Sequence, residues 1–153
     1  MQTSFNNSFD KTVQTLSRTL SEEYVLMLKT QNFHWNIEGP LFFSMHSLLG
    51  HQYKSLGEKV DSIAETIRSY GSKAPGSFRD FLKTALIDEA PSDPITPHQM
   101  IEILNKDHLA LATRIKEHRE EAEKTGDVHA IVIYEDLISF HEKASWMIRS
   151  HRA

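Results

Sequence analysis

Apolar residues recur at spacings of three and four along most of this 153-residue chain. That period places them on one face of an α-helix, whereas a half-buried strand would alternate every second residue. The first run covers 9–31, with His34 continuing the same face, and the others cover 45–70, 100–122 and 128–148. The pattern therefore predicts an all-α chain with four long helices.

Residues that commonly end or begin helices separate these runs. Gly71 follows the second run and opens a connection rich in proline and glycine over 71–97, in which FRDFLKTALI could form a short helix. A Thr-Pro pair at 96–97 is typical of a helix start, and a Gly-Asp pair at 126–127 separates the last two helices. Two short turns and one long crossover predict a ferritin-like four-helix bundle with a short extra helix in the crossover.

The length suits one domain, so we expect a single domain over 1–153 with short loose tails at 1–8 and 150–153. The chain has no cysteine, so any metal must be bound by His, Asp or Glu. The N-terminus lacks a basic segment followed by an apolar run, and no apolar stretch approaches the ~20 residues that cross a bilayer. We therefore expect a cytoplasmic protein without a membrane partner.

The segment NFHWNIEGPLFFSMH carries two histidines twelve residues apart. His34 continues the apolar face of the first helix, and His46 lies near the start of the second. The Gly-Pro pair at 39–40 allows the chain to reverse, which brings the two histidines close together. Considered separately, His34 and His46 are each interpreted as a packing or surface histidine without a functional role, and Trp35 as a packing residue. Together they can form half of a site.

Asp61 and Glu65 stand four residues apart on the second predicted helix. Their carboxylates share one face and can bind a cation such as iron, although most such pairs are simply solvated. At 100° per residue, the pair points roughly 140° away from the apolar face of its own helix. It therefore faces either water or another molecule.

His46 and Asp61 are fifteen residues apart, which is about 22 Å along a helix. Because a ligand approaches iron to within roughly 2 Å, one chain cannot bring all four groups to one metal. Two chains related by a two-fold axis can, if the histidine end of one meets the carboxylate end of the other. None of the nine histidines has a glutamate three residues before it, which disfavours a diiron site within one bundle.

These motifs together resemble a known family. HWN at 34–36, GP-x-F at 39–42, the second histidine, and VDSIAE at 60–65 resemble the Dps family of mini-ferritins, named for the DNA-binding protein from starved cells. The resemblance covers essentially the whole chain, including HEKASWM at 141–147. It implies a hollow shell of twelve subunits with a ferroxidase centre at each dimer interface.

By this resemblance, His34 and His46 are metal ligands from one subunit, Asp61 and Glu65 are ligands from its partner, and Trp35 lies beside the site. The implied activity is oxidation of Fe(II) to Fe(III), typically by hydrogen peroxide, with storage of ferric mineral and protection from oxidative damage. Carboxylates suit Fe(III) and imidazole suits Fe(II). The alternatives are a structural or DNA-compacting shell and a four-helix interaction module without metal.

The chain departs from the family at two places. Thr66 follows Glu65 where the family often has arginine, which changes a local ion pair and leaves the ligand in place. The tails lack the lysine-rich composition of many DNA-binding members, and twelve chains with a net charge of −4 would carry about −48. We therefore predict no DNA binding near neutral pH.

Acidic residues near the last helix could line a three-fold pore for iron uptake, or could be a solvated helix junction. They are Glu121, Glu123, Asp127 and Glu135. The remaining histidines are interpreted as surface or helix-packing residues. They are His51, His98, His108, His118, His129, His141 and His151.

Overall fold

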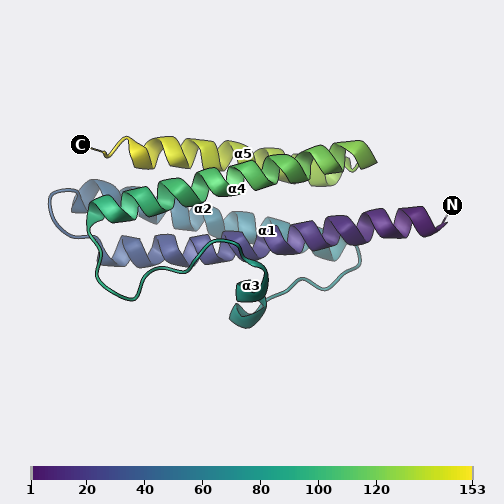
Figure 1. Ribbon diagram of the computed structural model, residues 1–153, viewed down its shortest axis with the longest axis horizontal. Coiled ribbons are helices and arrows are strands. Elements are labelled where there is room, and N and C mark those ends of the chain that lie inside the picture. Colours follow the sequence, from purple (N-terminus) through teal and green to yellow (C-terminus); the bar gives the residue numbers. More distant parts are fainter. Residues whose placement is uncertain (1, 153) are drawn as a thin grey trace.

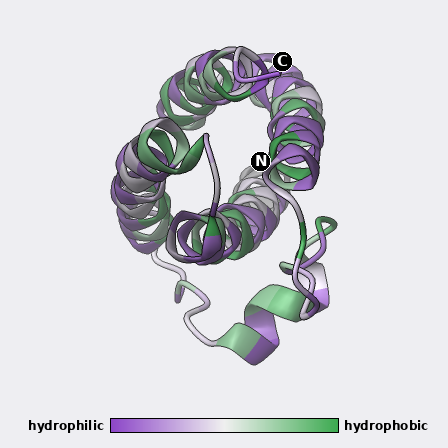
Figure 2. Cartoon of the chain, turned by 90° about the vertical axis from the view of Figure 1, so that its left-hand side faces the viewer, coloured by the Kyte–Doolittle hydropathy of each residue, from purple (hydrophilic) through white to green (hydrophobic). Residues whose placement is uncertain are grey.

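The computed structural model describes residues 2–152, with side chains from residue 10 onward. Its helices are α1 (Gln2–Asn36), α2 (Phe42–Ser69), α3 (Phe78–Thr84), α4 (Pro97–Thr125) and α5 (Val128–Arg149), and residues 2–152 contain no strand. The four long helices form a bundle, and the view along its axis places α3 outside their ring (Figures 1 and 2). The predicted four-helix bundle with a short crossover helix is confirmed.

Local signals set the helix ends that the sequence predicted. The Thr96 side chain accepts a hydrogen bond from the Gln99 backbone N–H, and the Gln99 side chain accepts one from the Thr96 backbone N–H. This capping box stands before Pro97, the first residue of α4. Gly126 ends α4 with a φ of 71°, and Asp127 caps α5 through its side chain.

The single domain over 1–153 and the loose tails at 1–8 and 150–153 stay predictions. Helix α1 spans Gln2–Asn36, and it is uninterrupted because no glycine or proline stands before Gly39. The side chains of 1–9 lie outside the described residues, as do Met1 and Ala153. Within the described chain, none of the helices combines the length and apolarity needed to cross a bilayer.

The core between the long helices contains both apolar and ionic groups. Each long helix contributes fully buried aliphatic side chains, such as Leu26, Leu56 and Leu104. Between α1 and α4, the ammonium of Lys29 lies 2.7 Å from a carboxylate oxygen of Asp107, and the Lys29 side chain is only 2% exposed. A buried ammonium without this partner would be strongly unfavourable, so the pair ties α1 to α4.

Candidate metal centre

The turn between α1 and α2 brings the two predicted histidines into contact. His34 lies in the last turn of α1, and His46 lies in the first turns of α2. Their rings are stacked, with centroids 3.8 Å apart and planes 14° apart. Gly39 adopts a φ of 85°, a left-handed conformation that glycine accepts without strain and that lets the chain reverse here.

Each histidine is oriented by the backbone of the other. The Nδ1–H of His34 donates to the carbonyl oxygen of His46 at 2.6 Å, and the Nδ1–H of His46 donates to the carbonyl oxygen of His34 at 2.7 Å. Since a carbonyl oxygen can only accept, each neutral ring carries its proton on Nδ1 and keeps a lone pair on Nε2. Metal-binding histidines are commonly oriented in this way through their second nitrogen.

Aromatic side chains surround the histidine pair. Phe42 stacks on His46 with a centroid distance of 4.9 Å, and Tyr53 lies 5.3 Å from the His34 ring. Trp35 is 59% exposed. Tyr53 belongs to the apolar face of α2 in the sequence, so its contact with His34 could not be recognised before the packing of α1 on α2 was known.

Asp61 and Glu65 lie on an exposed face of α2, as the helical projection predicts. In the part of the chain with described side chains, neither carboxylate has a hydrogen bond or ion pair. No three His, Asp or Glu side chains among the described residues converge on a common metal position. One chain therefore brings His34 and His46 together and leaves the carboxylate pair apart from them.

An apolar groove lies between α1 and α3, on the side of α1 that also carries Trp35. Exposed hydrophobic side chains line it, and we call them the α1–α3 apolar patch: Leu28, Trp35, Phe78 and Leu82. Phe78 is 63% exposed, although α3 is held to α1 by the stacking of Phe81 on Tyr24 at 4.7 Å. Contiguous exposed apolar surface of this kind marks interaction sites.

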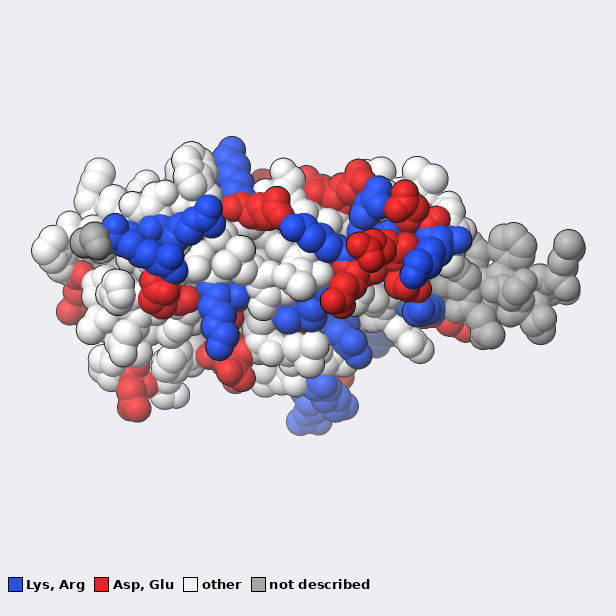
Figure 3. Space-filling view, turned by 45° about the horizontal axis from the view of Figure 1, so that its top comes forward, with Lys and Arg blue, Asp and Glu red and all other residues white. Residues whose placement is uncertain are grey.

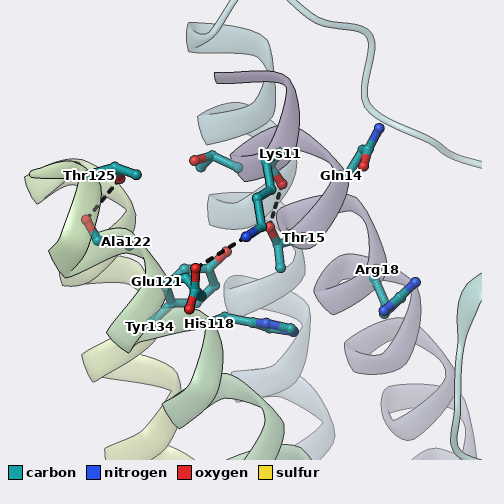
Figure 4. A pocket seen from close by; sticks show the side chains of 10 residues that line it. Lys11, Gln14, Thr15, Arg18, His118, Glu121, Ala122, Thr125 and Tyr134 are labelled. Atoms are coloured by element: carbon teal, nitrogen blue, oxygen red, sulfur yellow. Dashed lines mark hydrogen bonds and ion pairs between the residues drawn. The ribbon is translucent and has the colours of Figure 1, made fainter. Parts of the chain in front are cut away.

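The acidic residues considered for a pore gather around the α4–α5 junction, and most of them are paired with bases. Glu121 contacts Lys11 at 3.1 Å and Lys124 at 2.7 Å, and Lys11 and Glu121 both line a pocket formed by α1, α4 and α5 (Figure 4). Arg119 pairs with Glu123 and Glu135. Asp127 accepts a hydrogen bond from Tyr70. Acidic and basic side chains accordingly lie interspersed over the face in Figure 3. The pore stays a prediction.

Two histidines that the sequence left as packing or surface residues form a buried hydrogen-bonded chain. His141 Nε2 lies 2.6 Å from a carboxylate oxygen of Glu23, and His141 Nδ1 lies 2.8 Å from His108 Nδ1. All three side chains are fully buried. Burial, and next the neighbouring His141, hold the pKa of His108 well below its usual value. The Nε2 atom of His108 is buried and has no hydrogen-bond partner among the described residues.

Comparison with known proteins gives one family. The ferritin-like domain matches residues 13–153. An uncharacterised low-temperature-induced protein of Nostoc is 32% identical over 139 residues, which is 90% of this chain and 78% of that protein. A protein of Bacillus anthracis named DNA protection during starvation protein 2 is 28% identical over 90% of this chain and 94% of its own length.

Solved structures agree with the sequence relatives. The Dps structure from Thermosynechococcus elongatus superposes with a TM-score of 0.91 at 26% identity, covering 96% of this chain and 93% of that one. The Dps structure from Vibrio cholerae, described as a member of a superfamily of ferritin-like diiron-carboxylate proteins, gives a TM-score of 0.88 at 29% identity. That match covers 94% of this chain and 90% of the other.

Proposed function

The chain belongs to the Dps group of the ferritin-like family, and on this basis we propose that two copies of it form iron-oxidation sites at their shared interface. Membership supports iron storage with ferroxidase-type oxidation as the general function. The observation that carries the proposal is the pair of reciprocal Nδ1 hydrogen bonds, which direct the Nε2 lone pairs of His34 and His46 away from the backbone.

In the proposed site, His34 and His46 of one subunit meet Asp61 and Glu65 of its partner. The exposed and unpaired state of both carboxylates supports this arrangement, because a ligand committed to an ion pair within its own chain would have to leave it. Antiparallel packing of two α2 helices about a two-fold axis gives two identical sites. The imidazoles bind Fe(II) as substrate, and the carboxylates stabilise the Fe(III) product.

Hydrogen peroxide is the proposed oxidant. Two Fe(II) ions each give one electron to one peroxide molecule, its O–O bond breaks, and two protons from solvent complete two water molecules. Consuming both electrons in one site avoids release of a hydroxyl radical, which gives the reaction a protective role against oxidative damage. The histidine and carboxylate ligands leave coordination positions open for the oxidant.

Self-assembly is part of the proposal, since a single chain holds only half of the ligands. The α1–α3 apolar patch supports a homodimer, because burying exposed aromatic and aliphatic side chains is favourable. Further assembly into a twelve-subunit shell that stores ferric mineral follows the family. Bacterial relatives and the absence of cysteine support a location in the bacterial cytoplasm.

We propose that this protein does not bind DNA near neutral pH, although relatives are named for DNA protection. The net charge of −4 per chain repels a phosphate backbone, and it does so more strongly in a shell. Duplex DNA should therefore migrate freely beside the protein in a gel at pH 7.5 and moderate salt. Tight retention of the duplex would favour a DNA-compacting shell instead.

Substitution of the histidines tests the site. The His34→Ala/His46→Ala variant should keep its oligomeric state and lose most of its peroxide-driven Fe(II) oxidation, measured as the initial rate of Fe(III) formation. His98→Ala removes an exposed histidine at the start of α4 and should oxidise iron as the wild type does. An intact double variant that oxidises Fe(II) at the wild-type rate would show that these histidines are not the ligands.

A further inference from the structure

Gly50 is a glycine in the interior of α2 whose backbone does not require glycine. Its φ is not positive, unlike those of Gly39, Gly71 and Gly126. Glycine in a helix interior is less favourable than alanine, because it loses more conformational freedom on folding. Glycine at position 50 is explained by the space that a side chain there would fill. The His34 ring occupies this space.

The His34 ring lies directly on the backbone of α2 at Gly50. A Cβ atom at this position would lie 3.0 Å from His34 Cε1 and 3.3 Å from His34 Nδ1. Favourable contacts between carbon atoms lie at about 3.5–4.0 Å, so the ring would have to move away by a few tenths of an ångström. Gly50 lies one helical turn after His46 on α2. The His34 ring packs against this turn, where its Nδ1–H also donates to the His46 carbonyl oxygen.

Movement of the ring would disturb the contacts that orient it. Its Nδ1–H donates to the His46 carbonyl at 2.6 Å, and displacement away from α2 lengthens this bond. The stacked His46 ring at 3.8 Å and the nearby Tyr53 ring limit the directions in which it can shift. A lengthened hydrogen bond no longer holds the His34 proton on Nδ1 or fixes the orientation of the ring. The Nε2 lone pair is then not kept available and directed toward a metal.

We propose that Gly50 is a positioning residue for His34: the missing side chain lets the ring rest on α2 with its Nδ1–H on the His46 carbonyl and its Nε2 free for iron. This inference rests on the proposed function of the histidine pair. Metal–ligand distances tolerate errors of only about 0.2 Å, and loss of the groups that orient a ligand typically lowers metal affinity or activity by about 10–100-fold.

Two alanine substitutions on the same helix separate positioning from a general effect on α2. Gly57 lies two turns beyond Gly50, and a Cβ there would meet only Met27 Sδ at an ordinary 3.7 Å. Both substitutions raise helix propensity equally. Gly50→Ala should slow Fe(II) oxidation by about 10-fold or more, whereas Gly57→Ala should oxidise iron as the wild type does, with the oligomer intact in both.

A double-variant cycle identifies the residue through which Gly50 acts. In a His34→Ala background the ring is gone, so Gly50→Ala should cause no further loss of activity. Should Gly50→Ala fail to assemble, the double variant with His34→Ala should assemble again, because the close contact has been removed. Further loss in the double variant, or failure of the double variant to assemble, would overturn the positioning role.

A measurement without iron distinguishes failure of this inference from failure of the proposed function. The ¹⁵N imidazole shifts of His34 should report a single Nδ1-protonated tautomer in the wild type and Gly57→Ala, and a mixture in Gly50→Ala. Unchanged shifts together with a wild-type oxidation rate in Gly50→Ala would overturn the inference. Altered His34 shifts in Gly50→Ala, combined with wild-type iron oxidation in His34→Ala/His46→Ala, would support the positioning role of Gly50 and reject the iron site.

Discussion

Two inactive variants should restore each other's activity if every site takes its histidines from one subunit and its carboxylates from another. One variant is His34→Ala/His46→Ala, which keeps both carboxylates. The other is Asp61→Ala/Glu65→Ala, which keeps both histidines. Each variant alone should lose nearly all peroxide-driven iron oxidation, since each of its sites lacks half of its ligands.

The size of the recovery follows from the two-fold geometry. A mixed dimer contains one site with all four ligands and one site with none, because the intact histidines and the intact carboxylates belong to different chains. Random mixing of equal amounts makes half of the dimers mixed, so about a quarter of all sites should be complete. A site within one chain would give no recovery. The separation of about 22 Å along α2 between His46 and Asp61 already opposes such a site.

The assay requires real exchange of subunits. The variants would be dissociated, combined and reassembled, and mixed dimers would be verified by mass spectrometry of differently tagged chains. The initial rate of Fe(II) oxidation would then be compared with that of the same variants combined without dissociation. A verified mixed population with no activity above this control would refute the intersubunit arrangement.

Two further predictions concern the buried polar groups. Because the pKa of His108 lies well below its usual value, the unfolded chain binds more protons than the folded chain as pH falls below about 6.5, and the free energy of unfolding should fall by up to about 1.4 kcal/mol per pH unit. Thermal unfolding between pH 7 and 4.5 should show a shallower loss for His108→Leu, and equal slopes would contradict this assignment. Asp107→Ala should cost about 3–5 kcal/mol in urea unfolding, because it leaves the Lys29 ammonium buried and unpaired. Lys29→Met/Asp107→Leu should recover most of this loss, and equal losses in both variants would contradict the explanation.

Most of the fold could be predicted because its signals are local. Helical period, the Thr96 cap and the left-handed Gly126 act within a few residues of where they stand, so their spacing alone defines the elements. The start of α1 was less predictable, since the first residues contain no glycine or proline to mark it.

The candidate site could be predicted only in part. Helices convert sequence separation into distance, so the spacing of His46 and Asp61 indicated a second chain. The carbonyl contacts and the role of Gly50 depend on how closely α1 packs on α2, which residue type alone does not specify. The same limit applies to the acidic junction, where Lys11 reaches Glu121 across 110 residues of sequence.

The proposed division of ligands between two chains has a consequence for when iron is oxidised. If the proposed ligands are correct, a lone subunit would present the imidazoles of His34 and His46 without the oxygen ligands that favour Fe(III), and would give little driving force for oxidation. In the proposed site, the carboxylates of Asp61 and Glu65 come only from the partner subunit. On the proposed arrangement, iron oxidation is therefore coupled to assembly, and ferric product forms only where another subunit is already in place.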